Sequence, residues 1–166
     1  MEEARRDAGL SFGDRFTALS NRFYARIRHP QAFSAAGEAG TASDFSAFAG
    51  RKYALLTTFK RDGTAVPTPV WFGPAGDRLY VRSEADVGKV KRIRNDPHVR
   101  IAPASVRGKP LGPTTEATAR LLPAGEAERA EAALAANYGL FRRVYERGGE
   151  RMGVDTVYIE VVPAAG

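Results

Sequence analysis

The sequence predicts a mainly β protein of the α+β class, an antiparallel barrel with helices at its side. Six stretches are apolar or alternate apolar and polar residues, as strands with at least one buried face do. Short turns join most of these stretches, and Asp62-Gly63 is a dipeptide that commonly closes a β-hairpin. No repeated strand–helix–strand alternation is present, so a parallel sheet is not expected.

The elements follow from local patterns. The six strands are expected at residues 53–59, 64–72, 79–83, around 99–101, 115–122 and 156–162. A short basic helix should follow Asp86, a suitable N-cap, and end near Asn95, because Pro97 disfavours helical backbone at the residue before it. Residues 125–138 form an Ala-rich pattern that predicts a helix ending at Gly139.

Two regions are expected: residues 1–50, an N-terminal basic amphipathic helix and linker, and residues 51–166, the barrel. Apolar residues recur at helical spacing over 12–27, with arginines largely off that stripe. Such a helix either packs on the barrel or a second subunit, or makes membrane-surface contact. Residues 34–49 are small and polar, which indicates a linker ahead of the barrel.

Composition narrows the function classes. Of the 166 residues, 43% are hydrophobic, yet no apolar run approaches the roughly 18 residues of a membrane span. The first residues lack the apolar segment of a secretory signal, so a cytoplasmic protein is expected. With no cysteine and two histidines, neither a disulfide nor a metal site is predicted. The net charge of +6 favours an anionic partner: nucleic acid, a membrane surface or a phosphorylated ligand.

The expected short helix carries most of the chemistry. Lys89 and Arg92 are three residues apart and share a face, while Lys91 and Arg94 share a neighbouring one. Ser83 places a hydroxyl at the end of the strand before it. A hydroxyl, the donor-rich start of a helix and one or two cations together form a seat for a phosphate. The alternative is a solvated basic face without a ligand.

The second expected strand contains two prolines, two residues apart. Pro67 and Pro69 remove two N–H groups from one edge, which a central strand does not tolerate, whereas Thr68 and Val70 keep theirs on the other edge. We therefore expect pairing on the Thr68 side and an opening on the proline side. With Trp71 beside it, this opening would be a slot for a flat ring. The alternative is a protected sheet edge with Trp71 in the core.

Four segments occur in a characteristic order: YALLTTF, DGTAVPTPVWF, LYVRS and GKVKRIRNDPHV. Together they resemble the split β-barrel superfamily of pyridoxamine-phosphate oxidase-like flavoproteins, over about residues 50–162. The match is closest to the branch that uses a deazaflavin, coenzyme F420, in place of FMN. The resemblance implies a six-stranded split β-barrel and a homodimer with the cofactor at the subunit interface. It also implies an oxidoreductase that transfers hydride between reduced coenzyme F420 and a small organic substrate.

The resemblance also implies roles for single residues. Lys89 matches the lysine that binds the cofactor phosphate, and Ser83 matches a hydroxyl residue in the same seat. The residues that match the strand lining the isoalloxazine-type ring are Thr68, Pro69, Val70 and Trp71. Lys91 and Arg92 are not fixed by the motif and are candidate contacts to a phosphate or an anionic tail.

No catalytic residue is predicted, because in such enzymes the cofactor supplies the chemistry while the protein orients and desolvates it. Tyr138 is expected to pack rather than to donate a proton. The branch often has another cation just before Lys89, where this chain has Val87 and Gly88. FMN is the alternative cofactor, although the Thr-Pro-Val-Trp strand lacks the arginine and long polar residues typical of FMN oxidases.

Two other function classes remain as alternatives. A split barrel of this kind also suits a non-enzymatic protein that binds a cofactor, a lipid or a tetrapyrrole. Nucleic-acid binding through the basic helix is not expected, because the sequence does not interleave aromatic and basic residues as stacking platforms do.

Overall fold

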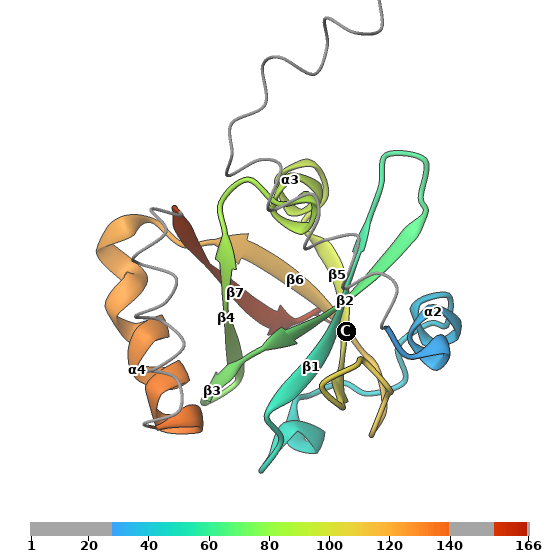
Figure 1. Ribbon diagram of the computed structural model, residues 1–166, viewed down its shortest axis with the longest axis horizontal. Helices are drawn as coiled ribbons and strands as arrows, with labels where there is room; N and C mark the ends of the chain where they lie inside the picture. The colour runs from blue at the N-terminus through green and yellow to red at the C-terminus, as the bar shows by residue number, and fades with distance from the viewer. Residues whose placement is uncertain (1–27, 140–154, 166) are drawn as a thin grey trace, which may run out of the picture.

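The computed structural model describes residues 28–139 and 155–165. Its strands form one antiparallel sheet in the order β2-β1-β5-β6-β7-β4-β3, curled into a half-barrel (Figure 1). The strands are β1 (Tyr53–Phe59), β2 (Ala65–Trp71), β3 (Gly73–Ala75), β4 (Arg78–Glu84), β5 (His98–Ala104), β6 (Thr115–Leu121) and β7 (Thr156–Pro163). The predicted α+β split barrel is confirmed, although the described residues form a sheet of seven strands where six were expected.

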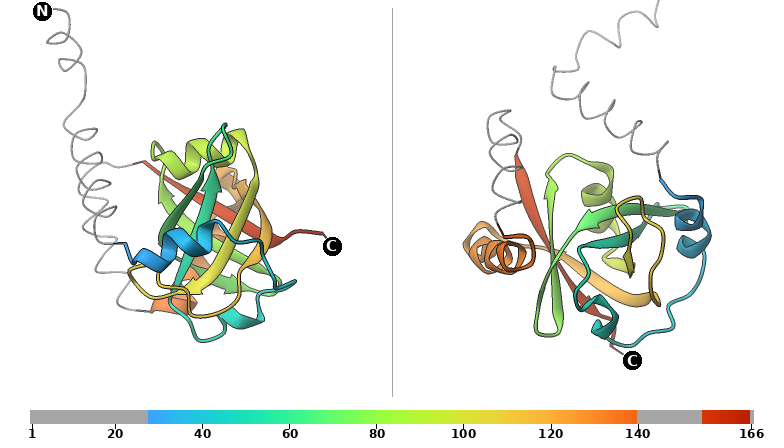
Figure 2. Two further views of the ribbon diagram at one scale, coloured as in Figure 1. Left: turned by 90° about the vertical axis from the view of Figure 1, so that its right-hand side faces the viewer. Right: turned by 60° about the horizontal axis from the view of Figure 1, so that its bottom comes forward.

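Three helices of the described residues flank the sheet (Figures 1 and 2). The helices are α2 (Pro30–Ala36), α3 (Gly88–Asn95) and α4 (Ala127–Tyr138). In Figure 1, α3 lies over the top of the barrel, α4 lies on the left and α2 on the right. None of these helices is long and apolar enough to cross a membrane. The amphipathic helix predicted over residues 12–27 lies outside the described residues, and so does the membrane contact expected of it.

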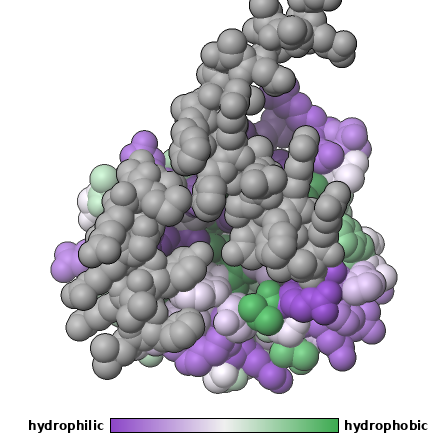
Figure 3. All heavy atoms as spheres, in the orientation of Figure 1, coloured by the Kyte–Doolittle hydropathy of each residue, from purple (hydrophilic) through white to green (hydrophobic). Residues whose placement is uncertain are grey.

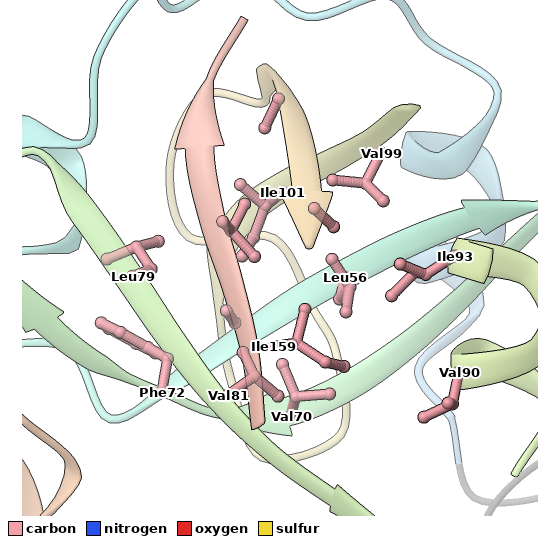
Figure 4. Packing of buried hydrophobic residues seen from close by; sticks show 14 of the residues in the cluster. Leu56, Val70, Phe72, Leu79, Val81, Val90, Ile93, Val99, Ile101 and Ile159 are labelled. Carbon is pink, nitrogen blue, oxygen red and sulfur yellow. The ribbon is translucent and has the colours of Figure 1, made fainter. Parts of the chain in front are cut away.

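The apolar side chains of the alternating patterns that predicted the strands also fill the barrel. Apolar side chains from the strands meet inside it, and α3 contributes two more that close its end (Figure 4). The largest fully buried residues of this core are Phe48, Leu56, Phe72, Leu79, Val81, Val90, Val99, Ile101, Ile159 and Val161. The helix α3 is therefore held against the barrel by Val90 and Ile93.

The stretch after β2 differs from the expectation. No strand was expected between residues 72 and 79, yet Gly73–Ala75 form a short strand, β3, paired with β4. One extended stretch therefore pairs first with β1 and then, beyond Phe72, with β4. This change of partner is what splits the barrel.

Two details of the helices also differ. Asp86 is not the N-cap of α3: Val87 occupies that position, and its carbonyl accepts the N–H groups of Val90 and Lys91. Part of the expected linker is helical, because α2 begins at Pro30 and His29 caps it by accepting the N–H of Gln31. The segment between α2 and β1 also contacts the barrel, through Phe48 in the core.

Gly73 allows α4 to approach the sheet closely. A Cβ at Gly73 would lie 2.4 Å from backbone atoms of Ala133 and Leu134, which cannot rotate away. We expect Gly73→Ala to lower the free energy of unfolding by about 2 kcal/mol, as overpacking does. Urea unfolding followed by circular dichroism would measure it. Gly125→Ala is the control, because a Cβ there meets nothing within 4 Å; equal midpoints for the two variants would contradict the close approach.

Candidate functional site

The strand β2 lies at one end of the sheet and, among the described strands, is hydrogen-bonded only to β1. The register places Thr68 opposite Leu56. Because Pro67 and Pro69 have no N–H, the donors that pair with β1 are those of the alternate residues, including Thr68. The proline edge therefore faces away from β1, as the sequence predicted.

The neighbour across this edge is β4. In the β3–β4 pair Gly73 stands opposite Tyr80. Continuing that register would bring Trp71 opposite Arg82 and Pro69 opposite Glu84, yet no pairing occurs there. We call this unpaired stretch, between residues 67–71 of β2 and 82–84 of β4, the β2–β4 seam.

The helix α3 begins beside the seam, directly after the turn that follows β4. Its N-terminus has no side-chain cap and no acidic residue in the first turn, so its first N–H groups are available to an anion. Lys89 makes no hydrogen bond or ion pair within the described ranges. Burial lowers the pKa of Lys89 to about 8; the charge of Glu84 opposes this shift, while Arg92 and Arg28 add to it.

Arg92 adds a second cation to this helix start. Its Nε donates to Thr58 Oγ1 on β1 at 2.7 Å. Its guanidinium lies over Gly88, where an added Cβ would come within 2.7 Å of Nη1. Burial lowers the pKa of Arg92, and the charge of Arg28 lowers it further. Arg92 therefore places a cation over Gly88, and the absence of a side chain at Gly88 leaves room for it. We call the start of α3 with Lys89 and Arg92 the anion seat.

A hollow of about 260 Å³ adjoins the anion seat. It lies between α3 and the turn of the β1–β2 hairpin, and its lining residues are Phe59, Lys60, Arg61, Lys91, Arg92 and Asn95. Arg61 Nε donates to Asn95 Oδ1 at 3.2 Å, which ties the hairpin to the helix. At 3.6 residues per turn, Lys89, Arg92, Asn95 and Lys91 follow one another around α3. Arg92 thus belongs both to the anion seat and to this α3 hollow.

The four residues predicted to line a ring lie in different surroundings. Thr68 and Pro69 are half-buried, whereas Val70 is buried in the barrel core and offers only its backbone outside. Trp71 stacks on Tyr138 with ring centroids 5.0 Å apart and meets Tyr53 edge-on at 6.4 Å. One face of the indole is therefore already covered.

Tyr138 and Ser83 are both engaged. The Tyr138 hydroxyl accepts the N–H of Phe72 at 2.8 Å and donates to the carbonyl of Lys52, which confirms its packing role. Ser83 is buried and its hydroxyl donates to the carbonyl of Glu84 at 3.0 Å. To bind a phosphate, Ser83 would have to exchange this bond.

The anion seat and Trp71 lie toward opposite ends of β2. Thr58, which Arg92 contacts, is paired with Val66, and Trp71 lies five residues further along the strand. At about 3.3 Å per residue this is a span of roughly 17 Å. The seam between the two points is therefore longer than a single ring.

The sequence matches the family model described as pyridoxamine 5'-phosphate oxidase over residues 43–164. The chain belongs to this family. The match begins after α2 and takes in all the strands, the anion seat and the α3 hollow. A comparison with curated proteins found no match.

Solved structures similar to this pyridoxamine 5'-phosphate oxidase family member carry varied descriptions. A conserved hypothetical protein from Mycobacterium tuberculosis is 18% identical, with a TM-score of 0.55, covering 77% of this chain and 87% of that chain. An F420 reductase is 19% identical, with a TM-score of 0.51, covering 75% and 96%. A heme binding protein from Mycobacterium smegmatis is 18% identical, with a TM-score of 0.51, covering 81% and 51%. At these identities the likeness shows the fold.

Sequence reasoning missed one cation of this family member. Arg28 lies before the matched region, yet its charge lowers the pKa of both Lys89 and Arg92, which places it near the anion seat. The only signal in the sequence was an arginine-rich stretch that ends just before Pro30. Periodicity assigned those arginines to the polar side of a helix and gave no position for any of them.

The lowered pKa of Lys89 predicts a pH dependence of stability. The folded chain releases this proton near pH 8, whereas the unfolded chain keeps it until about the ordinary value of 10.5. Since stability rises with pH wherever the unfolded state binds more protons, this residue destabilises the fold at neutral pH and ceases to do so between pH 8 and 10.5. Urea unfolding should show that the free energy of unfolding rises less between pH 8 and 10.5 for Lys89→Met than for the wild type. Lys91→Met, an exposed change of the same kind, is the control; parallel curves for all three would contradict the assignment.

Proposed function

We propose that this chain is an oxidoreductase that uses the deazaflavin coenzyme F420 and transfers hydride between the reduced cofactor and a small organic substrate. The observation that carries the proposal is the meeting of the unpaired proline edge of β2 with a cation-rich helix start beside it. Family membership supports a cofactor-binding barrel, and the similar F420 reductase supports the choice of cofactor.

The residues present suit such a cofactor. Lys89, with its ammonium unpaired in the described ranges, and the first N–H groups of α3 would hold the phosphate. The residues proposed to line the ring are Thr68, Pro69, Trp71 and the backbone of Val70. The α3 hollow, lined by four cations and no acid, would take an anionic tail through Lys91 and Arg92.

When bound, the deazaflavin supplies a hydride donor or acceptor at a ring carbon. The chain fixes the position of that ring and keeps water from it. Lys89 and Arg92 anchor one end through charge, so that the ring is oriented along β2 rather than free to rotate. No side chain is assigned a proton, because the Tyr138 hydroxyl is held between Phe72 and Lys52.

Two alternatives differ in the ligand. FMN carries a phosphate that would suit the anion seat but has no long anionic tail for the α3 hollow, so the hollow favours the deazaflavin. A tetrapyrrole carrier finds less support, because both histidines are engaged. His29 caps α2, and His98 stacks on Phe59 while its Nε2 lies 2.5 Å from Glu116 Oε2.

The proposed assembly is a homodimer with the cofactor at the interface. Three large apolar side chains are exposed in the described part of the chain: Phe33 on α2, and Val106 and Leu111 on the 105–112 loop. The two elements touch, because the position of a Cβ on Gly108 lies 3.5 Å from Ala32. Figure 3 shows green, hydrophobic spheres among purple ones on the right and lower parts of the face drawn there. Light scattering tests the proposal: a dimeric mass is expected, and a monomer at micromolar concentration would contradict it.

Equilibrium titration of the purified chain with coenzyme F420, FMN and haemin, side by side, tests the cofactor. We expect coenzyme F420 to bind most tightly. In Lys91→Ala the difference in affinity between coenzyme F420 and FMN should become smaller. Turnover of reduced coenzyme F420 with added acceptors separates the enzyme from a carrier. Tighter binding of FMN or haemin would overturn the F420 assignment, and tight F420 binding without turnover over a broad panel would favour a carrier.

A further inference from the structure

Arg28 has no ion pair with any residue in the described ranges, and its Nε is buried. It belongs to the segment before the family match, which begins at residue 43. The backbone beside it is fixed: the N–H of His29 donates to the carbonyl of Arg107 at 2.8 Å, and α2, which follows, packs against β2. Arg28 is therefore held beside the barrel at its β2 side.

The side chain of Arg28 contains a buried hydrogen-bond donor that is unsatisfied within the described residues. The residue is only partly exposed, and its Nε is buried without a hydrogen-bond partner among the described residues. A buried N–H of a guanidinium without an acceptor is unfavourable, and such groups in folded proteins usually meet a partner, which includes ligands. A negatively charged acceptor would satisfy this Nε donor and balance the charge of the guanidinium.

The charges around Arg28 define that acceptor further. Its guanidinium is near enough to Lys89 and Arg92 to lower the pKa of both, and burial lowers its own pKa. Among the described residues, Glu84 is the one acid whose charge acts on the pKa of Lys89. Three cations beside one acid repel one another, and an anion of more than one charge between them would offset this repulsion. A phosphate or pyrophosphate group has this charge.

We propose that Arg28 is a third cationic ligand of the anion held by Lys89 and Arg92, so that this residue, which precedes the family-matched region, lies at one side of the anion seat. This inference rests on the proposed function only for the identity of the ligand; the chemistry it requires is a phosphate. It makes Arg28 a part of the binding site, and binding would then stabilise the position of Arg28 on the barrel. By reciprocity, whatever displaces Arg28 would weaken binding.

The test compares the full-length wild type with Arg28→Ala, Arg28→Lys and Arg51→Ala. Arg51 is an exposed arginine just before β1, whose far end, not its start, contacts Arg92. Titration with coenzyme F420 and FMN should show affinity falling about ten- to a hundredfold in Arg28→Ala, less in Arg28→Lys, and not at all in Arg51→Ala. Inorganic pyrophosphate should raise the melting temperature of the wild type and of Arg51→Ala, but hardly that of Arg28→Ala.

The pKa of Lys89 distinguishes a role of Arg28 through its charge from a merely structural role. If Arg28 acts through charge, the pKa of Lys89, read by NMR in the unliganded protein, should rise in Arg28→Ala, because a neighbouring cation has gone. Unchanged affinity for all three probes in a folded Arg28→Ala would overturn the inference and leave the proposed function intact. Failure of the wild type to bind either flavin, with pyrophosphate still discriminating Arg28→Ala, would overturn the proposed function alone. Failure of the wild type to bind pyrophosphate as well would overturn both.

Discussion

Lys89→Ala is expected to weaken binding of coenzyme F420 by about 1.5–3 kcal/mol, which is roughly ten- to 150-fold in Kd. The ammonium of Lys89 makes no hydrogen bond or ion pair within the described ranges, and its pKa is lowered to about 8 by burial. A cation held in this way gains more from a bound phosphate than an exposed one does. Its removal takes away one charged hydrogen-bond donor and leaves none of its neighbours unpaired.

Isothermal titration calorimetry with coenzyme F420 should compare the affinity of Lys89→Ala with that of Arg94→Ala, a variant of the same helix. Arg94 is exposed on α3, outside the lining of the α3 hollow, so its removal changes net charge equally without touching the anion seat. The fold should tolerate Lys89→Ala, since the unliganded protein loses an unfavourably buried charge. Equal affinity for the two variants would remove Lys89 from the site and, with it, the cofactor orientation proposed above.

Glu160→Gln is expected to lower the free energy of unfolding by about 3 kcal/mol at neutral pH, the loss typical of a broken buried ion pair. Glu160 is 4% exposed on β7, beneath α4. Its carboxylate accepts hydrogen bonds from four side chains at 2.9–3.2 Å: Arg78, Tyr80, Arg120 and Arg129. This Glu160 network joins β4, β6, β7 and α4. The three guanidiniums are 42–47% exposed and can rehydrate, which keeps the estimate at the lower end of such losses.

The pH dependence of the Glu160 network gives a second measurement. Burial acts to raise the pKa of Glu160, but hydrogen bonds from Arg120, Arg78 and Tyr80 outweigh it and hold this pKa below its ordinary value of 4.5. The stability that Glu160 adds is therefore present above pH 4.5 and is lost as pH falls through the folded-state pKa. The difference between wild type and Glu160→Gln should shrink on acidification. Glu128→Gln, an exposed change on α4, is the control; matching urea midpoints for the two variants at pH 7 would contradict the role assigned to the network.

The strands and α3 were predictable because their signals are local. Alternation placed Leu79 and Val81 on one face of β4, and the proline pair placed β2 at a sheet edge. Pro97 ended α3 near Asn95, as expected. In each case the deciding residues lie within a few positions of the element they define.

The remainder of the site depended on contacts between distant segments. Glu160 appears in the sequence as an ordinary outward residue of a strand, and only α4, packed over it, makes it buried. Gly88 appears as a departure from the cofactor-binding motif, whereas Arg92 fills its space from one helical turn away. Arg28 reaches the anion seat from outside the family match, so no local pattern could place it.

The two prolines of β2 also bear on how the chain behaves in a crowded solution. A bare sheet edge normally offers a row of donors and acceptors to which a strand of another molecule can attach, and this is a common start of aggregation. Pro67 and Pro69 remove two consecutive donors from that row, so a foreign strand would find carbonyls there without matching N–H groups. The same two residues that leave the seam between β2 and β4 unpaired would thus also prevent intermolecular β-pairing there.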